Sequence, residues 1–295
     1  PLTSYPADFA EPLWQFGLSR VANLPPSSLA LVGTEKGRDL LALFDLENHK
    51  LEKVSLDWDV ISSIASLDGK IYLIGASSTT FSSLVAYDMA SQKLEIIYQT
   101  QEGDFKGEQL SIPEAIECTN RHGDSIYGFL YMPPKPLSSP TPLIVKCHSG
   151  PTSRVTPQLN LAIQFFTTRG YAFLEVNYGG STGYGRAFRN RLREKWGELD
   201  VTDTIDVVTS LVEKGRIDKR QIYITGSSSG GLTALLAAAQ SRLFSKCSVM
   251  YAVTDLIGMT EETHKFELHY LDSLIAPYPE GNALYLERSP LNQLE

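Results

Sequence analysis

The sequence predicts two architectures in one chain: repeated β-strand units over residues 1–110, and an α/β domain with a mostly parallel sheet over residues 111–295. Three observations predict them. A pattern recurs in the first third of the chain, strands and helices alternate after residue 111, and a glycine-rich turn joins an apolar strand to an apolar helix near residue 228. The first observation fits a domain of repeated sheets, and the other two fit a sheet covered by helices.

The first third of the chain contains an internal repeat. Residues 44–52 (FDLENHKLE) match residues 87–95 (YDMASQKLE) in step, at an offset of 43 residues, and LVG at 31–33 matches LIG at 73–75. A period of about 40–50 residues with about four short strands per unit is typical of β-propeller blades. An ordinary pair of β-meanders is the alternative. Two units cannot close a ring, so we expect further blades before Pro1.

From residue 111 the chain alternates strands with helices, which favours a mostly parallel sheet covered on both faces. Helices are expected at residues 159–168 and 201–214. Strands are expected at residues 115–119, 125–132, 142–147, 171–178, 221–225 and 247–253. A Pro/Ser-rich loop follows the second strand at 133–142. The glycine-rich loop at 179–185 (GGSTGYG) has the wrong glycine order for a dinucleotide-binding fingerprint.

Residues 221–240 (QIYITGSSSGGLTALLAAAQ) hold the turn around which the α/β domain is organised. Residues 226–230 match G-x-S-x-G between strand and helix, which predicts a nucleophile elbow: Ser228 adopts positive φ and presents its hydroxyl above the sheet. The backbone N–H of Ser229 then faces a substrate oxyanion. A Ser/Gly linker or an ordinary βα turn is the alternative, but the apolar flanks favour the elbow. The predicted fold is an α/β hydrolase, incomplete at its C-terminus and preceded by a partial β-propeller.

A second oxyanion donor is expected from the turn after the strand at residues 142–147. His148, Ser149 and Gly150 follow this strand directly. Small residues at such a turn allow backbone N–H groups to approach the substrate carbonyl, and a simple strand-end turn is the alternative. The loss of one such donor typically costs about 3–4 kcal/mol of transition-state stabilisation.

Composition argues against several function classes. The net charge of −8 and a pI near 5.2 disfavour nucleic-acid binding, which requires a basic face. No apolar run approaches the ~20 residues that cross a bilayer, and the N-terminus lacks a signal-peptide pattern. No spacing predicts a metal or an organic cofactor. The three cysteines are expected to be buried free thiols of a cytoplasmic protein: Cys118, Cys147 and Cys247.

Four segments resemble, in this order and spacing, the catalytic domain of the prolyl oligopeptidase family of serine peptidases: KCHSGPTS, VNYGGSTGYGRAFR, KWGELDVTD and GSSSGG. The sequence is most similar to the dipeptidyl-peptidase and acylaminoacyl-peptidase branch, whose members carry a β-propeller ahead of an α/β-hydrolase domain. THKFELHYLDSL and ERSPLN extend the resemblance. It implies hydrolysis of short peptides or acyl-peptides by a Ser–Asp–His triad, with a propeller that admits small peptides and excludes folded proteins.

The resemblance also implies roles for single residues. Ser228 is the nucleophile, and Ser229 supplies one oxyanion N–H. The turn from His148 to Gly150 supplies the other, and some relatives use a Tyr hydroxyl at the position of His148. The pocket for the residue before the scissile bond would be a modest apolar one, lined by Val253, Leu256 and Met259.

Two departures from the family pattern matter. The usual turn in this branch is His-Gly-Gly-Pro, and Ser149 replaces one glycine. The acid and the histidine of the triad are also missing, because in this fold they follow later strands, and the residues after Ser228 hold one clear strand. We therefore expect them beyond residue 295, since the chain stops at Leu294 and Glu295 where relatives begin the next strand. The chain by itself is then expected to be nearly inactive.

Local substitutes for the triad acid and base are the less favoured interpretation. Asp255 follows the strand after the elbow helix, and His264 and His269 lie in a segment that is expected to be helical. Neither histidine follows a new strand, so neither is expected within hydrogen-bond reach of Ser228. Packing on a helix face or between domains is expected for both.

Two other functions remain open from the sequence. One is an esterase on the same fold, which the propeller repeat disfavours; ester against peptide turnover would decide. The other is a non-catalytic protein that binds a partner on its propeller, which the intact elbow disfavours. The expected partner is a short peptide substrate, without nucleic acid or membrane, and the oligomeric state stays undetermined.

Overall fold

A computed structural model describes residues 3–12, 15–101, 110–135, 137 and 139–293. Leu294, Glu295 and parts of the loop at 133–142 therefore lie outside the described residues. The chain divides into two compact units. One comprises Pro1–Ile112, Thr156–Leu161 and Gly183–Gly185, and the other comprises Pro113–Val155, Ala162–Thr182 and Arg186–Glu295.

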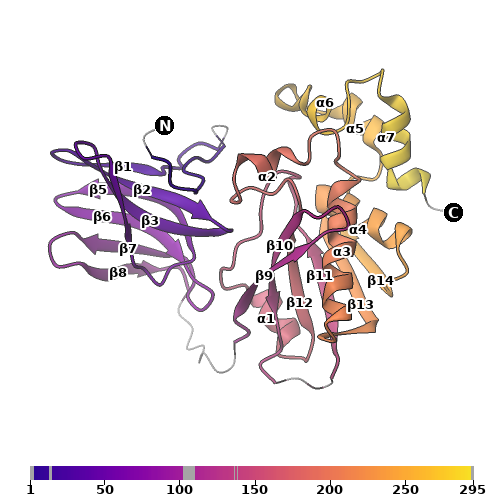
Figure 1. Cartoon of the computed structure of the whole chain (residues 1–295), viewed down its shortest axis with the longest axis horizontal. Coiled ribbons are helices and arrows are strands. Elements are labelled where there is room, and N and C mark those ends of the chain that lie inside the picture. The colour runs from indigo at the N-terminus through magenta and orange to yellow at the C-terminus, as the bar shows by residue number, and fades with distance from the viewer. Residues whose placement is uncertain (1–2, 13–14, 102–109, 136, 138, 294–295) are drawn as a thin grey trace. The chain divides into compact units, whose positions relative to one another are not determined.

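The first unit contains two four-stranded antiparallel sheets, whose strands follow the order of the sequence (Figure 1). The first sheet consists of β1 (Val21–Leu24), β2 (Ser28–Glu35), β3 (Arg38–Asp45) and β4 (Lys50–Val54). The second consists of β5 (Val60–Leu67), β6 (Lys70–Ala76), β7 (Ser83–Asp88) and β8 (Lys93–Gln99). Alternate side chains of both sheets share one apolar core, which includes Val32, Leu41, Ile61, Leu73 and Val85. This alternation is typical of sheets with one buried face.

The repeat found in the sequence occupies equivalent places in the two sheets. Residues 31–33 lie in β2 and 73–75 in β6, while the longer matched segments form the β3–β4 and β7–β8 hairpins. The repeated aspartates explain the match, because each closes its hairpin turn: Asp45 Oδ1 accepts two backbone N–H groups, and so does Asp88 Oδ1. The prediction of about four strands per unit is confirmed. That these units are propeller blades stays a prediction.

The second unit is built on a six-stranded sheet of order β14-β13-β11-β12-β10-β9 (Figure 1). Four of its strands run parallel to one another: β11 (Thr141–Cys147), β12 (Ala172–Asn177), β13 (Ile217–Ser227) and β14 (Lys246–Met250). The hairpin of β9 (Pro113–Thr119) and β10 (Ser125–Tyr131) adds to β12 in the antiparallel direction. The sheet is therefore mixed, with a parallel centre.

Helices bury both faces of this sheet. Residues of α3 (Leu199–Glu213) and α4 (Ser229–Gln240) join the larger core, and Ile163 of α1 (Leu161–Thr167) joins the smaller one on the other face. The remaining helices are α2 (Arg186–Asn190), α5 (Leu256–Glu262), α6 (Tyr270–Leu274) and α7 (Asn282–Arg288), with short 3₁₀ turns η2 (Lys265–Glu267) and η3 (Pro290–Asn292). The alternation of strands and helices predicted after residue 111 is present.

The structure corrects three expectations. The strand expected at 247–253 ends at Met250, because Tyr251 adopts φ of 39°, which breaks the extended backbone. The helix expected around the two later histidines is interrupted: α5 ends at Glu262 and a 3₁₀ turn follows. Of the three free cysteines only Cys147 is buried, whereas Cys118 is half-buried and Cys247 is exposed, because β9 and β14 are the two edges of the described sheet.

Candidate active site

The turn between β13 and α4 has the strained backbone that the sequence predicts. Ser228 adopts φ of 51° and ψ of −125°, outside the regions that residues other than glycine favour, and it immediately precedes the helix. Strand and helix therefore meet with a single residue between them. Ser228 as a residue is half-buried, so part of it is accessible to solvent.

Close backbone packing explains the glycines on either side of Ser228. A Cβ atom on Gly226 would lie 2.1 Å from the carbonyl oxygen of Gly230, and one on Gly230 would lie 2.3 Å from the carbonyl oxygen of Cys147. Real side chains do not approach backbone oxygens this closely, so both positions require glycine. These contacts bring the first turn of α4 against the ends of β13 and β11.

Backbone hydrogen bonds hold Ser228 between the ends of two strands. Its N–H donates to the Met250 carbonyl at 3.3 Å, and its own carbonyl accepts from the N–H of Val253 at 3.1 Å. The same carbonyl accepts from Gly231 and Leu232 in α4, at 3.0 and 3.2 Å. Over the residues that the structure describes, no hydrogen bond joins the Ser228 hydroxyl to a histidine.

The His148–Gly150 turn follows β11, next to β13. The His148 ring is buried and stacks on Tyr178 with ring centroids 4.4 Å apart. Its Nδ1 lies 3.1 Å from the Ser149 carbonyl and its Nε2 lies 2.9 Å from Ser181 Oγ. This pattern fits a neutral ring that donates from Nδ1 and accepts the Ser181 hydroxyl proton at Nε2. The imidazole is therefore held by the turn itself, by Tyr178 and by Ser181.

Ser149, the residue that departs from the family pattern, connects the turn to the elbow strand. Its hydroxyl lies 2.9 Å from the carbonyl oxygen and 2.8 Å from the hydroxyl oxygen of Ser227. A glycine could make neither contact. Gly150, which follows, adopts φ of 64° and is exposed.

Burial lowers the pKa of the His148 imidazole from 6.5 to about 4. The folded protein therefore binds fewer protons than the unfolded chain between these values, and stability is lost as the pH falls through this window. We expect the wild-type unfolding free energy to fall relative to that of His148→Gln by roughly 3 kcal/mol between pH 7 and pH 4. Denaturant titrations at several pH values measure this difference.

The matched control is His49→Gln, because His49 is exposed in the β3–β4 hairpin and Gln92 occupies the equivalent position of the repeat with nearly the same φ. The effect must be measured as a difference between wild type and variant, because Asp200 has the opposite effect on the pH dependence of stability. Burial raises the pKa of Asp200 to about 6, so its ionisation lowers the unfolding free energy as the pH rises. If the unfolding free energies of the wild type and of His148→Gln changed with pH in parallel, protonation of His148 would not destabilise the folded protein, which would contradict the prediction.

The three residues predicted to line the substrate pocket lie beyond β14. Val253 precedes α5, and Leu256 and Met259 lie in it. All three pack against the larger core. Leu256 is fully buried there, whereas Val253 and Met259 are half-buried and keep some exposed surface.

The local candidates for acid and base have other partners. Asp255 caps the N-terminus of α5, where it accepts the Ile257 N–H at 3.0 Å. His264 and His269 expose 66% and 82% of their side chains and lie near the carboxylates three residues later, Glu267 and Asp272. Both side chains are therefore largely exposed and paired locally, and the packing on a helix face or between domains expected for them is not seen within the described second unit.

The structure also places two carboxylates of the KWGELDVTD segment in the interior, which sequence reasoning did not identify. Asp200 accepts a hydrogen bond from the Gly197 N–H at 2.7 Å and another from the Thr233 hydroxyl of α4. Asp203 accepts from Asn120 Nδ2 and from the Gly179 N–H, both at 2.8 Å. Their spacing on one helix face was the available signal, but it carries no information on which distant segments they meet.

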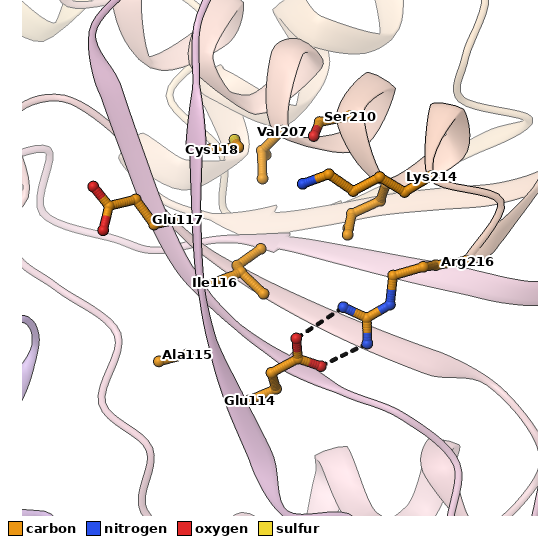
Figure 2. A pocket seen from close by; sticks show the side chains of 10 residues that line it. Glu114, Ala115, Ile116, Glu117, Cys118, Val207, Ser210, Lys214 and Arg216 are labelled. Atoms are coloured by element: carbon orange, nitrogen blue, oxygen red, sulfur yellow. Dashed lines mark hydrogen bonds and ion pairs between the residues drawn. The ribbon is translucent and has the colours of Figure 1, made fainter.

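A groove of about 210 Å³ lies between β9 and α3 (Figure 2). Glu114 and Arg216 form two hydrogen bonds across it, at 2.9 and 2.6 Å, and Cys118 lies at its far end. Burial raises the pKa of this thiol to about 11, so it is not a thiolate at neutral pH. None of the predicted site residues lines this groove.

The described residues contain no group of three or more His, Cys, Asp or Glu side chains that could hold a metal ion. None of their helices has both the length and the apolar character needed to cross a bilayer.

A parallel-centred sheet with a nucleophile-type turn between β13 and α4 is the arrangement of the α/β-hydrolase class of proteins. Residues 157–295 match the family model described as "Prolyl oligopeptidase family". The chain therefore carries a prolyl oligopeptidase family domain, and the family resemblance of its motifs is confirmed.

Individual relatives agree with this assignment. The solved structure of a Mycobacterium tuberculosis puromycin-hydrolyzing peptidase is 34% identical, with a TM-score of 0.93 over 98% of this chain and 45% of that one. Dipeptidyl aminopeptidase BIII of Pseudoxanthomonas mexicana is 28% identical over 79% of this chain and 33% of its own length. The acylamino-acid-releasing enzyme of Mus musculus is 30% identical over 43% of this chain and 18% of its own length. The chain spans less than half the length of each relative.

Proposed function

We propose that the protein containing this chain is a serine peptidase that hydrolyses short peptides or acyl-peptides, with Ser228 as the nucleophile. The observation that carries the proposal is the strained backbone of Ser228, held at φ of 51° between β13 and α4. Strain of this kind persists where the surrounding structure over-determines it and is concentrated at functional sites. The substrate class comes from the relatives, which include a dipeptidyl aminopeptidase and an acylamino-acid-releasing enzyme.

In the proposed mechanism, Ser228 Oγ attacks the carbonyl carbon of the scissile bond and its proton passes to a base. The base returns this proton to the leaving nitrogen as the C–N bond breaks, and an acyl-enzyme remains that water hydrolyses. The negative oxygen of each tetrahedral intermediate is stabilised by the N–H of Ser229 and by a backbone N–H of the His148–Gly150 turn. Val253 and Met259 provide apolar surface for the residue before the scissile bond, and the buried Leu256 packs beneath them in the larger core.

We further propose that the acid and base come from residues outside the 295 of this chain. In α/β hydrolases both follow strands later than the elbow. The free edge of β14 supports this, because the described sheet pairs that strand with β13 alone. Met250, at the end of β14, and Tyr251 are 59% and 79% exposed, which is unusual for residues at the end of a parallel strand.

An active-site-directed phosphonate tests this proposal directly. In the longer protein, it should label Ser228 rapidly, as peptide mapping by mass spectrometry would show. In the 295-residue chain, labelling should be slower by several orders of magnitude, because a serine without a base is a weak nucleophile. Rapid labelling of the 295-residue chain would contradict the missing base, and labelling of another serine would contradict the assignment of Ser228.

A further inference from the structure

Asp200 of α3 contacts α4, the helix that follows the elbow at Ser228. It occupies the first turn of α3, is fully buried, and accepts the Thr233 hydroxyl from α4 as well as the Gly197 N–H. Both contacts are absent from the machinery described above. The Thr233 contact connects α3 to the helix that begins directly after the proposed nucleophile.

Thr233 lies within reach of a second acceptor. Its hydroxyl oxygen is 3.2 Å from the carbonyl oxygen of Ser229, one helical turn earlier. A threonine hydroxyl carries one proton, so it can donate to the Asp200 carboxylate or to the Ser229 carbonyl, but not fully to both. Ser229 opens α4, and its side chain is 3% exposed. Whether the Thr233 hydroxyl donates to Asp200 or to the Ser229 carbonyl therefore changes the hydrogen bonding of the first turn of α4.

We propose that Asp200 is a positioning residue of the elbow, and that its proton determines through Thr233 how the first turn of α4 is held. When Asp200 is charged, it accepts the Thr233 hydroxyl. When it takes up a proton from solvent, its O–H donates to Thr233 Oγ1, and the Thr233 hydroxyl turns to the Ser229 carbonyl. One O–H bond forms on Asp200 with a proton from solvent, two hydrogen bonds are exchanged, and no other covalent bond is made or broken. The link to catalysis rests on the proposed function, in which the Ser229 N–H binds the oxyanion.

The surroundings of Asp200 favour a proton near neutral pH. Three titratable groups face it: the Asp203 carboxyl on α3, which raises the pKa of Asp200, and the Cys147 thiol at the end of β11 and the Tyr178 phenol after β12, which burial keeps neutral. Among the ion pairs of the described residues none includes Asp200; Arg191 lies 3.7 Å from Asp203 instead. Burial raises the pKa of Asp200 to about 6, against the hydrogen bonds that lower it. Both protonation states are therefore populated between about pH 5 and pH 7.

The test follows the Ser229 amide by NMR in the 295-residue chain labelled with ¹⁵N-serine, with the resonance assigned from its loss in Ser229→Ala. In the wild type, this resonance should move with a midpoint near pH 6. Asp200→Asn should abolish the movement, Thr233→Val should reduce it by more than half, and Thr233→Ser should retain it. Asp206→Asn is the matched control, because Asp206 is an α3 carboxylate that pairs with Arg121.

Movement that persists in Asp200→Asn would overturn the proposal, and movement that is unchanged in Thr233→Val would overturn the relay through Thr233. If Asp200→Asn does not fold, the contrast between Thr233→Val and Thr233→Ser still decides. In the longer protein, Thr233→Val should lower kcat about 10-fold with little change in KM, and Thr233→Ser should restore it. Absence of hydrolysis in the wild type would count against the proposed function, while the NMR titration would still test the role of Asp200.

Discussion

Ser228→Ala is expected to lower peptide hydrolysis by the longer protein by about 10⁶-fold, the order of loss found when a serine nucleophile is removed. The loss should fall on kcat, because the substitution removes the attacking atom and leaves the apolar substrate surface intact. The variant should fold normally, since it deletes one oxygen atom from a half-buried residue and leaves the four backbone hydrogen bonds of residue 228 in place. The measurement is kcat and KM with a short peptide amide and an acyl-peptide, beside a thermal unfolding curve.

Ser210→Ala provides the matched control, because Ser210 lies on α3 beside the groove of Figure 2 and outside the proposed site. The outcomes separate the three functions. Hydrolysis of esters but not of peptides, lost in Ser228→Ala, would identify an esterase. A wild-type protein without either activity would favour the binding protein. Peptide hydrolysis that survives in Ser228→Ala would refute the assigned nucleophile.

Gly226→Ala is expected to destabilise the second unit by about 4 kcal/mol or more, a loss typical only of severe core defects. The added Cβ would lie 2.1 Å from the Gly230 carbonyl oxygen and 2.4 Å from its carbon. Both atoms belong to backbone, so no side chain can move aside. Relief requires β13 and α4 to separate, which disrupts the larger core that both contribute to. Denaturant unfolding of the purified variant, or its failure to accumulate as a folded protein, measures the effect.

Gly123→Ala is the control variant, because it introduces backbone strain without a close contact, whereas Gly226→Ala introduces a close contact without a positive φ. Gly123 has φ of 89° with nothing within 4 Å of a built Cβ, whereas Gly226 has an ordinary φ and a severe contact. The control should cost only about 1–2 kcal/mol, the price of a left-handed residue with a side chain. Equal losses in the two variants would show that the elbow tolerates a wider separation than the structure has.

Local patterns explain which features could be predicted from the sequence. The elbow depends on residues that are neighbours in the chain, so the order strand, glycine, serine, glycine, helix is sufficient to predict the positive φ of Ser228. The hairpin repeat is equally local, since Asp45 and Asp88 each bind backbone groups two and three residues later. The end of β14 was misplaced because residues 251–253 continue an apolar run, and a left-handed residue such as Tyr251 has no sequence signature.

The sequence by itself determined the order of elements in the second unit, the serine at the elbow and the turn at His148, because strand, helix and turn preferences act over a few residues. Only the tertiary structure decided that Asp200 meets Thr233, that Ser149 reaches Ser227, and that His148 is a buried neutral ring. These contacts join residues 33 to 78 positions apart in the chain. Their energies arise from burial and from hydrogen bonds that exist once the sheet has brought distant segments together.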